Sequence, residues 1–158
     1  MGLNYLSEDK KNIILKILKS YYVDNVSHLK DLSFFIDSKS KIYIADYNLL
    51  NYAKKLKVMN LGLYFGKFHK EKFRLSQEGC NIVKPVKNYL ILKKEALNSF
   101  LYGEDLLEED FDNPNQVDKS IFLPVRYKDK YLGCVLFLNR SYKNFISKGR
   151  KVDFNKVI

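Results

Sequence analysis

The sequence predicts an α+β fold in which an N-terminal α/β domain with a mostly antiparallel sheet is followed by a small closed or partly closed β barrel. Three observations support this fold class. An amphipathic helix pattern opens the chain, pairs of short β-prone segments joined by polar turns follow it, and Pro85 interrupts regular structure before a second β-rich pattern begins. With 158 residues, the chain can form one mid-sized core or two small ones.

The first predicted element is a helix that begins after Ser7. Serine suits the N-cap position, and Glu8 and Asp9 place negative charge at the positive end of the helix dipole. Apolar side chains then recur at three- and four-residue spacing, whereas lysines occupy the other side of the helix. The predicted apolar face consists of Ile13, Ile14, Ile17, Leu18 and Tyr21.

Two β-hairpins and a short helix complete the predicted N-terminal domain. The segments 32–37 and 41–46 are short, rich in β-prone residues and joined by a polar connection, which is typical of a hairpin. A short helix is expected over 49–56 and a second hairpin over 62–76, with its turn near 69–71. The glycines of the second hairpin indicate bulges or close approach of another backbone.

Pro85 marks the predicted boundary between an N-terminal domain (1–85) and a second domain (86–158), because the β pattern restarts immediately after it. The elements expected in the second domain are, in order, a strand at 88–93, a helix over 94–101 ended by Gly103, an acidic connection at 104–112, strands at 120–128 and 131–139, and a closing strand at 152–158.

The charge of the chain favours a polyanionic partner. Lys and Arg total 28 against 18 acidic residues, which gives a net charge of +10 and a pI near 9.4. A protein with this positive charge is suited to bind nucleic acid or an anionic membrane. Alternatively, the high lysine content reflects only the composition of the genome. The segment 139–152 holds five basic residues and no acidic one, and the acidic connection holds six carboxylates and no base.

The basic strip, as we call these five residues, consists of Arg140, Lys143, Lys148, Arg150 and Lys151. The positive charge of this strip can be neutralised in two ways, and both remain open. Either the acidic connection of the same domain pairs with it, or an external polyanion does. Tyr142 and Phe145 are interleaved with the cations, so that phosphates and unstacked bases could both be held, which favours RNA. The alternative is that both rings point into the barrel. Five neutralised phosphates would give a slope of log affinity against log salt of roughly −3 to −4.

The sequence offers no catalytic constellation. His28 and His69 lack nucleophile neighbours, and His69 is expected to be an exposed residue of a hairpin turn. Cys80 and Cys134 lack zinc-ligand spacing and are expected to be buried apolar groups. Because no nucleotide-binding motif occurs either, we expect a protein that is not an enzyme and has no cofactor or metal.

The longest apolar runs are far shorter than the roughly 18 residues that cross a bilayer. The amino terminus also lacks the apolar core of a signal peptide. A cytoplasmic location without membrane association is therefore expected.

Several words of the sequence, in this order, are similar to those of a known family: LGLYFGKFHKEKFRLS, SFLYGEDLL, YLGCVLFLN and GRKVD. They resemble the Nip-seven family of small ribosome-biogenesis factors over nearly the whole chain, and the opening YLSEDKKNIILKILKSYY is similar to its archaeal members. The resemblance implies an N-terminal α/β domain followed by a PUA domain, which is a compact β pseudo-barrel. It further implies a non-enzymatic role in large-subunit assembly and pre-rRNA processing, with RNA held by basic side chains of the PUA domain.

The resemblance also implies site residues. Arg140 and Lys143 fall on cationic positions of the archaeal pattern, Lys148 lies close to another, and Arg150 and Lys151 match the RKVD word of eukaryotic members. In PUA domains generally, the helix after the first strand and its final glycine line the RNA groove. The predicted RNA-binding residues are therefore Arg140, Lys143, Lys148, Arg150, Lys151, Tyr142, Lys93, Lys94 and Gly103. The sequence departs from the family pattern at one strand. The family has a glycine-rich, LGFG-like segment there, whereas this chain reads LGCV with Cys134 at the third position.

Two other functions remain open. The segment KNFISKGR is similar to the ending of PUA domains attached to Sun-type RNA cytosine methyltransferases, which would make the chain an accessory RNA-binding module of a separate enzyme. Alternatively, the acidic connection or the N-terminal helix docks ribosome-assembly proteins, and the chain is an adaptor. No small-molecule substrate is expected in either case.

Overall fold

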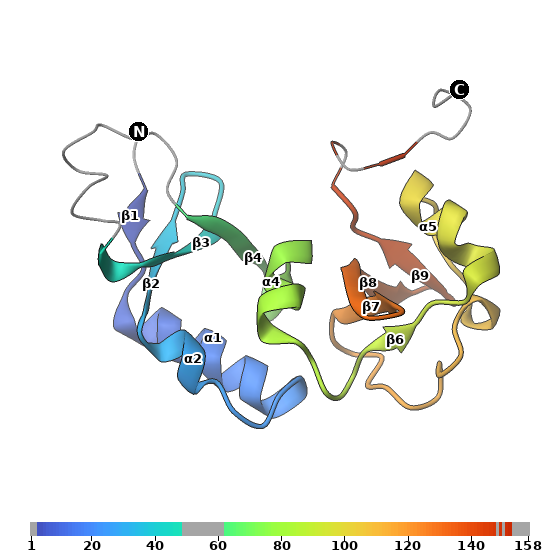
Figure 1. Cartoon of the computed structure of the whole chain (residues 1–158), viewed down its shortest axis with the longest axis horizontal. Helices are drawn as coiled ribbons and strands as arrows, with labels where there is room; N and C mark the ends of the chain where they lie inside the picture. Colours follow the sequence, from blue (N-terminus) through green and yellow to red (C-terminus); the bar gives the residue numbers. More distant parts are fainter. Residues whose placement is uncertain (1–2, 49–61, 148, 150, 153–158) are drawn as a thin grey trace.

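The computed structural model describes residues 3–48, 62–147, 149 and 151–152, in which two open sheets lie on either side of a short helix, α4 (Figure 1). The elements are β1 (Asn4–Tyr5), α1 (Glu8–Tyr21), α2 (Ser27–Lys30), β2 (Leu32–Ile36), β3 (Lys41–Asp46), β4 (Leu63–His69), β5 (Lys72–Leu75), α4 (Gln77–Val83), β6 (Leu90–Ile91), η1 (Lys94–Ala96), α5 (Leu97–Tyr102), η2 (Glu108–Asp110), β7 (Leu123–Tyr127), β8 (Lys130–Leu138) and β9 (Ser141–Asn144). The predicted α+β class is confirmed, and in the described residues the second sheet is open and not a closed barrel.

Helix α1 begins where the sequence predicts. The hydroxyl of Ser7 accepts a hydrogen bond of 3.3 Å from the backbone N–H of Lys10, and acidic residues fill the first turn. The predicted apolar face is partly wrong, because Ile13 is 51% exposed and the buried residues are Ile14, Leu15 and Leu18. The face that meets the sheet is therefore rotated toward Leu15.

The first sheet has the strand order β1-β2-β3-β4-β5 and is antiparallel throughout. Both predicted hairpins are present, as β2–β3 and β4–β5. A Cβ at Gly66 would lie 2.5 Å from the carbonyl oxygen of Arg74, and one at Gly62 would lie 2.1 Å from that of Ile44. The predicted close approach of backbone at these glycines is confirmed. The helix expected over 49–56 lies outside the described residues.

The second sheet has the order β6-β7-β8-β9, with β6 parallel to β7 and the other pairs antiparallel. Isolated bridges continue it at its margins, between Leu92 and Phe111 and between Leu106 and Tyr142. Helix α5 ends as predicted at Gly103, whose φ of 95° suits glycine at a left-handed C-cap. The predicted closing strand at 152–158 lies almost entirely outside the described residues.

Helix α4, which sequence reasoning missed, joins the two sheets. The hydroxyl of Ser76 caps it by accepting from the N–H of Gly79 at 2.9 Å. The side-chain amide of Asn81 exchanges two hydrogen bonds with the backbone of Tyr131 on β8, at 3.0 and 3.2 Å. The helix is therefore fixed by side-chain hydrogen bonds to the start of β8, ahead of the residues that pair with β9.

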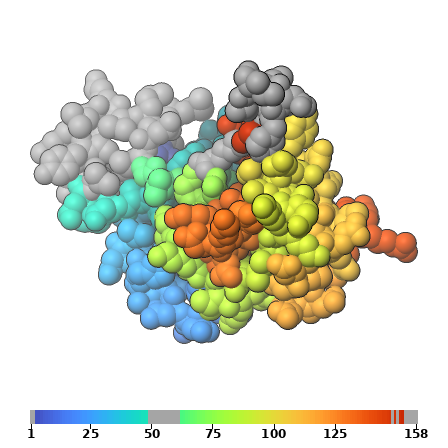
Figure 2. Space-filling view, turned by 45° about the vertical axis from the view of Figure 1, so that its right-hand side comes forward, coloured from blue at the N-terminus to red at the C-terminus, as the bar shows by residue number. Residues whose placement is uncertain are grey.

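Buried contacts between the sheets form one continuous hydrophobic core. The hydroxyl of Tyr22 donates to the carbonyl of Phe122 at 2.5 Å, and the sulfur atoms of Cys80 and Cys134 lie 3.7 Å apart. Both cysteines are buried, as predicted, and burial raises the pKa of the Cys80 thiol. Figure 2 shows the consequence, since the orange β7–β8 segment lies against green and yellow segments without a gap. The domain boundary at Pro85 stays a prediction.

None of the helices in the described part of the chain is long and apolar enough to cross a membrane.

Candidate nucleic-acid interface

The first half of the basic strip lies on β9 and on the turn that precedes it. Arg140 is exposed in the β8–β9 turn with a φ of 67°, and Lys143 is exposed in the middle of the strand. The Nζ atom of Lys143 lies 5.5 Å from the centroid of the Phe145 ring, within the range of a cation–π contact. Lys148 and Arg150 lie outside the described residues.

Tyr142 cannot stack on a base, and this part of the predicted site is wrong. Its relative exposure is 0%, and its ring centroid lies 5.0 Å from those of both Phe111 and Phe137. The cause is the alternation of a strand, which points Lys143 outward and its neighbour Tyr142 into the core. Phe145, the other interleaved ring, is only half-buried.

The end of the described chain brings two predicted residues together. The N–H of Val152 donates to the carbonyl of Leu101 on α5 at 2.8 Å, so the neighbouring Lys151 lies against Gly103. A Cβ at Gly103 would come within 2.5 Å of Cε of Lys151. The exposed Lys94 and half-buried Lys93 lie at the opposite end of the same helical segment, in and before η1. The structure therefore places Lys151 and Gly103 side by side, and the two other lysines apart from them.

The acidic connection runs beside β9, yet its carboxylates have other partners. Asp105 accepts from the N–H of Asn144 at 3.0 Å, Asp110 accepts from the N–H of Leu107 at 2.8 Å, and Glu108 forms an ion pair with Lys119. Among the described residues, no ion pair joins this connection to the basic strip. The exposed cations of the strip are therefore not capped by the carboxylates beside them.

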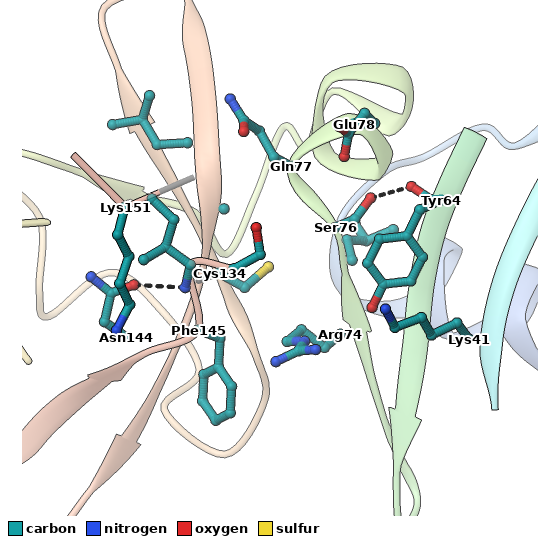
Figure 3. A pocket seen from close by; sticks show the side chains of 15 residues that line it. Lys41, Tyr64, Arg74, Ser76, Gln77, Glu78, Cys134, Asn144, Phe145 and Lys151 are labelled. Atoms are coloured by element: carbon teal, nitrogen blue, oxygen red, sulfur yellow. Dashed lines mark hydrogen bonds between the residues drawn. The ribbon is translucent and has the colours of Figure 1, made fainter. Parts of the chain in front are cut away.

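A cleft of about 450 Å³ lies where the two sheets meet (Figure 3). The cleft is lined on the side of the first sheet by Lys41, Tyr64 and Arg74. On the side of the second sheet it is lined by Asn144, Phe145 and Lys151. Arg74 points across the cleft, and its guanidinium carbon lies 4.9 Å from the centroid of Phe145. Glu78 on α4 is the acidic residue in the lining.

Sequence reasoning missed the contribution of the first sheet to this cleft. Arg74 lies directly opposite Lys67 in the second hairpin, so their side chains share a face, and the short turn of that hairpin could have revealed this pairing. The contribution of Lys41 could not have been found, since it depends on the register between strands separated by the segment 47–62.

His69 is half-buried beside this cleft, which corrects the expectation of an exposed turn residue. Its ring centroid lies 5.3 Å from that of Phe122 and 5.8 Å from that of Phe145. Within the described residues no hydrogen-bond partner reaches its buried Nε2 atom. Burial, followed by the charges of Arg74 and Lys67, lowers the pKa of His69 below its usual value of 6.5.

We expect the lowered pKa of His69 to make the protein less stable in acid. The unfolded chain takes up a proton near pH 6.5, whereas the folded chain does so only at lower pH, so the free energy of unfolding falls as the pH drops from about 6.5 through the folded pKa. NMR titration of the two histidines, assigned with a His28→Gln variant, measures the folded pKa directly. A folded value at or above 6.5 for His69 would contradict this expectation.

In the described ranges, no cluster of three His, Cys, Asp or Glu side chains could hold a metal ion. The cleft instead presents cations, amides and aromatic rings, which are groups that bind anions and flat rings.

The sequence profile of the NIP7/UPF0113 pre-PUA domain matches residues 4–76. This part of the chain is therefore similar to the pre-PUA domain of the NIP7/UPF0113 family. The resemblance to the Nip-seven family drawn from the sequence is thereby confirmed. The matched range ends at Ser76, the N-cap of α4, so the part similar to the pre-PUA domain contains the first sheet with α1 and α2.

Among solved structures, the whole chain is similar to a conserved PUA-domain protein from Thermoplasma acidophilum. The two structures align with a TM-score of 0.63 and 13% sequence identity, over 94% of this chain and 95% of that chain. At this identity the likeness shows the fold alone, which is that of a PUA-domain protein. No curated protein matches the sequence significantly.

Proposed function

We propose that this NIP7-family protein is an RNA-binding ribosome-biogenesis factor that acts in large-subunit assembly and pre-rRNA processing. It binds single-stranded or structured rRNA through the basic strip of its PUA-type unit, and its partners are RNA and ribosome-assembly proteins. The protein is not an enzyme and acts in the cytoplasm. The family match at residues 4–76 supports the biogenesis role over that of an accessory module of a methyltransferase.

This proposal rests on the exposure and the lack of ion pairing of those basic-strip cations that the structure describes. Arg140, Lys143 and Lys151 are exposed and have no ion-pair partner in the described residues, although six carboxylates lie in the adjacent connection. Phosphate oxygens pair well with such cations, because their association releases the counterions condensed on the nucleic acid. Lys93, Lys94 and Gly103 extend the predicted surface along the α5 segment.

We expect the triple variant Arg140→Gln, Lys143→Gln, Lys151→Gln to bind a labelled single-stranded oligouridine about 10- to 100-fold more weakly than the wild type, because three phosphate contacts are removed. Fluorescence anisotropy at a fixed salt concentration measures the affinity.

The matched control is Lys10→Gln, Lys16→Gln, Lys19→Gln on the exposed side of α1, which removes the same charge from the half of the molecule that does not contain β9 (Figure 1). Wild-type affinity in the strip variant, or an equal loss in the α1 control, would remove the proposed surface.

The adaptor role is favoured by one separate observation. Ile13 projects from α1 with half of its surface exposed, and Tyr21 is exposed on the same helix. A pull-down from RNase-treated extract tests this role, since partners that remain bound without RNA, and are lost in an Ile13→Asp variant, require a protein-binding face on α1.

A further inference from the structure

A row of three cations crosses the outer face of the first sheet. Lys41 on β3 lies directly opposite Lys67 on β4, and Lys67 lies directly opposite Arg74 on β5. Side chains that face each other in this way in antiparallel strands have Cβ atoms about 4.5–5.5 Å apart, and like charges in such pairs repel. We call these three residues the cationic row.

The described residues leave the cationic row without ion-pair partners. Lys41 lies over the ring of Tyr64 at 5.3 Å, and Arg74 lies over the ring of Phe145. The nearby carboxylate of Asp37 accepts hydrogen bonds from the backbone of Lys39 and Lys41 and from the hydroxyl of Tyr43, so it is committed to the β2–β3 turn. No salt bridge within the described part of the chain therefore relieves the mutual repulsion of the row.

Phe145 connects the cationic row to the basic strip. Its ring has Arg74 of the first sheet at 4.9 Å and Lys143 of the second at 5.5 Å. Cations of both sheets are thus held around one side chain at the mouth of the cleft, which Lys151 also lines. The cleft volume of about 450 Å³ lies within the range of roughly 300–1,000 Å³ that is typical of ligand sites.

We infer that the RNA strand bound by the basic strip continues across the cleft onto the pre-PUA domain, where its phosphates contact Lys41, Lys67 and Arg74. The half-buried rings of Tyr64 and Phe145 give the cleft apolar walls on both sides, against which a nucleotide can lie. This inference rests on the proposed RNA-binding function and extends its site from one domain to both. The polyanion is a single strand, because the aromatic rings that line the cleft between the row and the strip can accept unstacked bases.

The test compares four proteins by the salt dependence of their binding to a labelled oligouridine of about 16 nucleotides, the upper range of single-strand site sizes. They are the wild type, the strip variant, the α1 control and a row variant, Lys41→Gln, Lys67→Gln, Arg74→Gln. Each phosphate contact contributes about 0.7 to the slope of log affinity against log salt, so the row variant should lose about 2 from the magnitude of the slope. The α1 control should retain the wild-type slope.

A further variant protects the test against misfolding, because the row variant also loses two cation–π contacts. Lys67→Gln alone leaves both cation–π contacts in place, those of Lys41 and Arg74. It should reduce the magnitude of the slope of log affinity against log salt by about 0.7. A row variant that folds and keeps the wild-type slope, while the strip variant loses affinity, would overturn this inference and leave the proposed function intact. A wild-type protein that does not bind the oligouridine would overturn both. Polyglutamate that binds the wild type and not the row variant, with RNA affinity equal in both, would assign the row to an acidic protein segment instead.

Discussion

Replacement of Tyr142 by alanine is expected to lower the free energy of unfolding by about 3–5 kcal/mol, the range for truncating a large buried aromatic side chain. Tyr142 is fully buried between Phe111 and Phe137, so the substitution leaves a cavity inside the second sheet. Chemical denaturation followed by circular dichroism measures the change. An exposed base-stacking tyrosine would behave differently, because its loss would weaken RNA binding and leave the stability nearly unchanged.

The matched control for Tyr142 is Tyr102, which is 48% exposed on α5. Tyr102→Ala removes the same group from a position where little apolar surface is buried, and we expect a change within about 0.5 kcal/mol, as is usual for surface substitutions. If Tyr142→Ala were as mild as the control, the burial of the Tyr142 ring, and with it the orientation of β9, would be contradicted.

Replacement of Gly79 by alanine is expected to destabilise the protein by about 1–3 kcal/mol, the range for overpacking a well-packed core. A Cβ at this position of α4 would lie 2.2 Å from the backbone carbonyl oxygen of Phe65 on β4. Backbone cannot move aside as a flexible side chain can. The sign of the change in the free energy of unfolding is informative, because replacing glycine by alanine within a helix normally stabilises a protein by about 1 kcal/mol.

Gly149 provides the control for Gly79, because a Cβ there would meet no atom within 4 Å. We expect Gly149→Ala to leave the midpoint of denaturation almost unchanged. An increase in stability for Gly79→Ala would mean that α4 lies farther from β4 than the structure shows. The same displacement would separate the two walls of the cleft, since α4 is fixed to β8 through Asn81.

The elements that sequence reasoning found are those specified by local signals. Ser7 caps α1 and Gly103 ends α5 through interactions within a few residues, and the β4–β5 hairpin closes through a short turn. Helix α4 has seven residues and contains a glycine, so it offers neither a long apolar period nor a high helix propensity. Its position is determined by the two sheets that it contacts.

The candidate site was harder to predict than the fold, because it depends on which face of a strand each residue occupies. The charge pattern of the basic strip predicts a surface segment, whereas residues 141–144 form β9. Strand alternation separates Lys143 from Tyr142, and no count of charges or rings in the sequence reveals it. The cationic row depends further on the register of three strands, which pairs Lys41 with a residue far along the chain.

The salt dependence of RNA binding by the unmodified protein tests most directly whether its exposed cations form a polyanion-binding surface. A labelled oligouridine is titrated with the protein at potassium chloride concentrations between about 50 and 200 mM. We predict a linear fall of log affinity with log salt, with a slope of about −3 or steeper, since at least five cations would contact phosphates. Binding that is absent, or that does not change with salt, would contradict the proposed function.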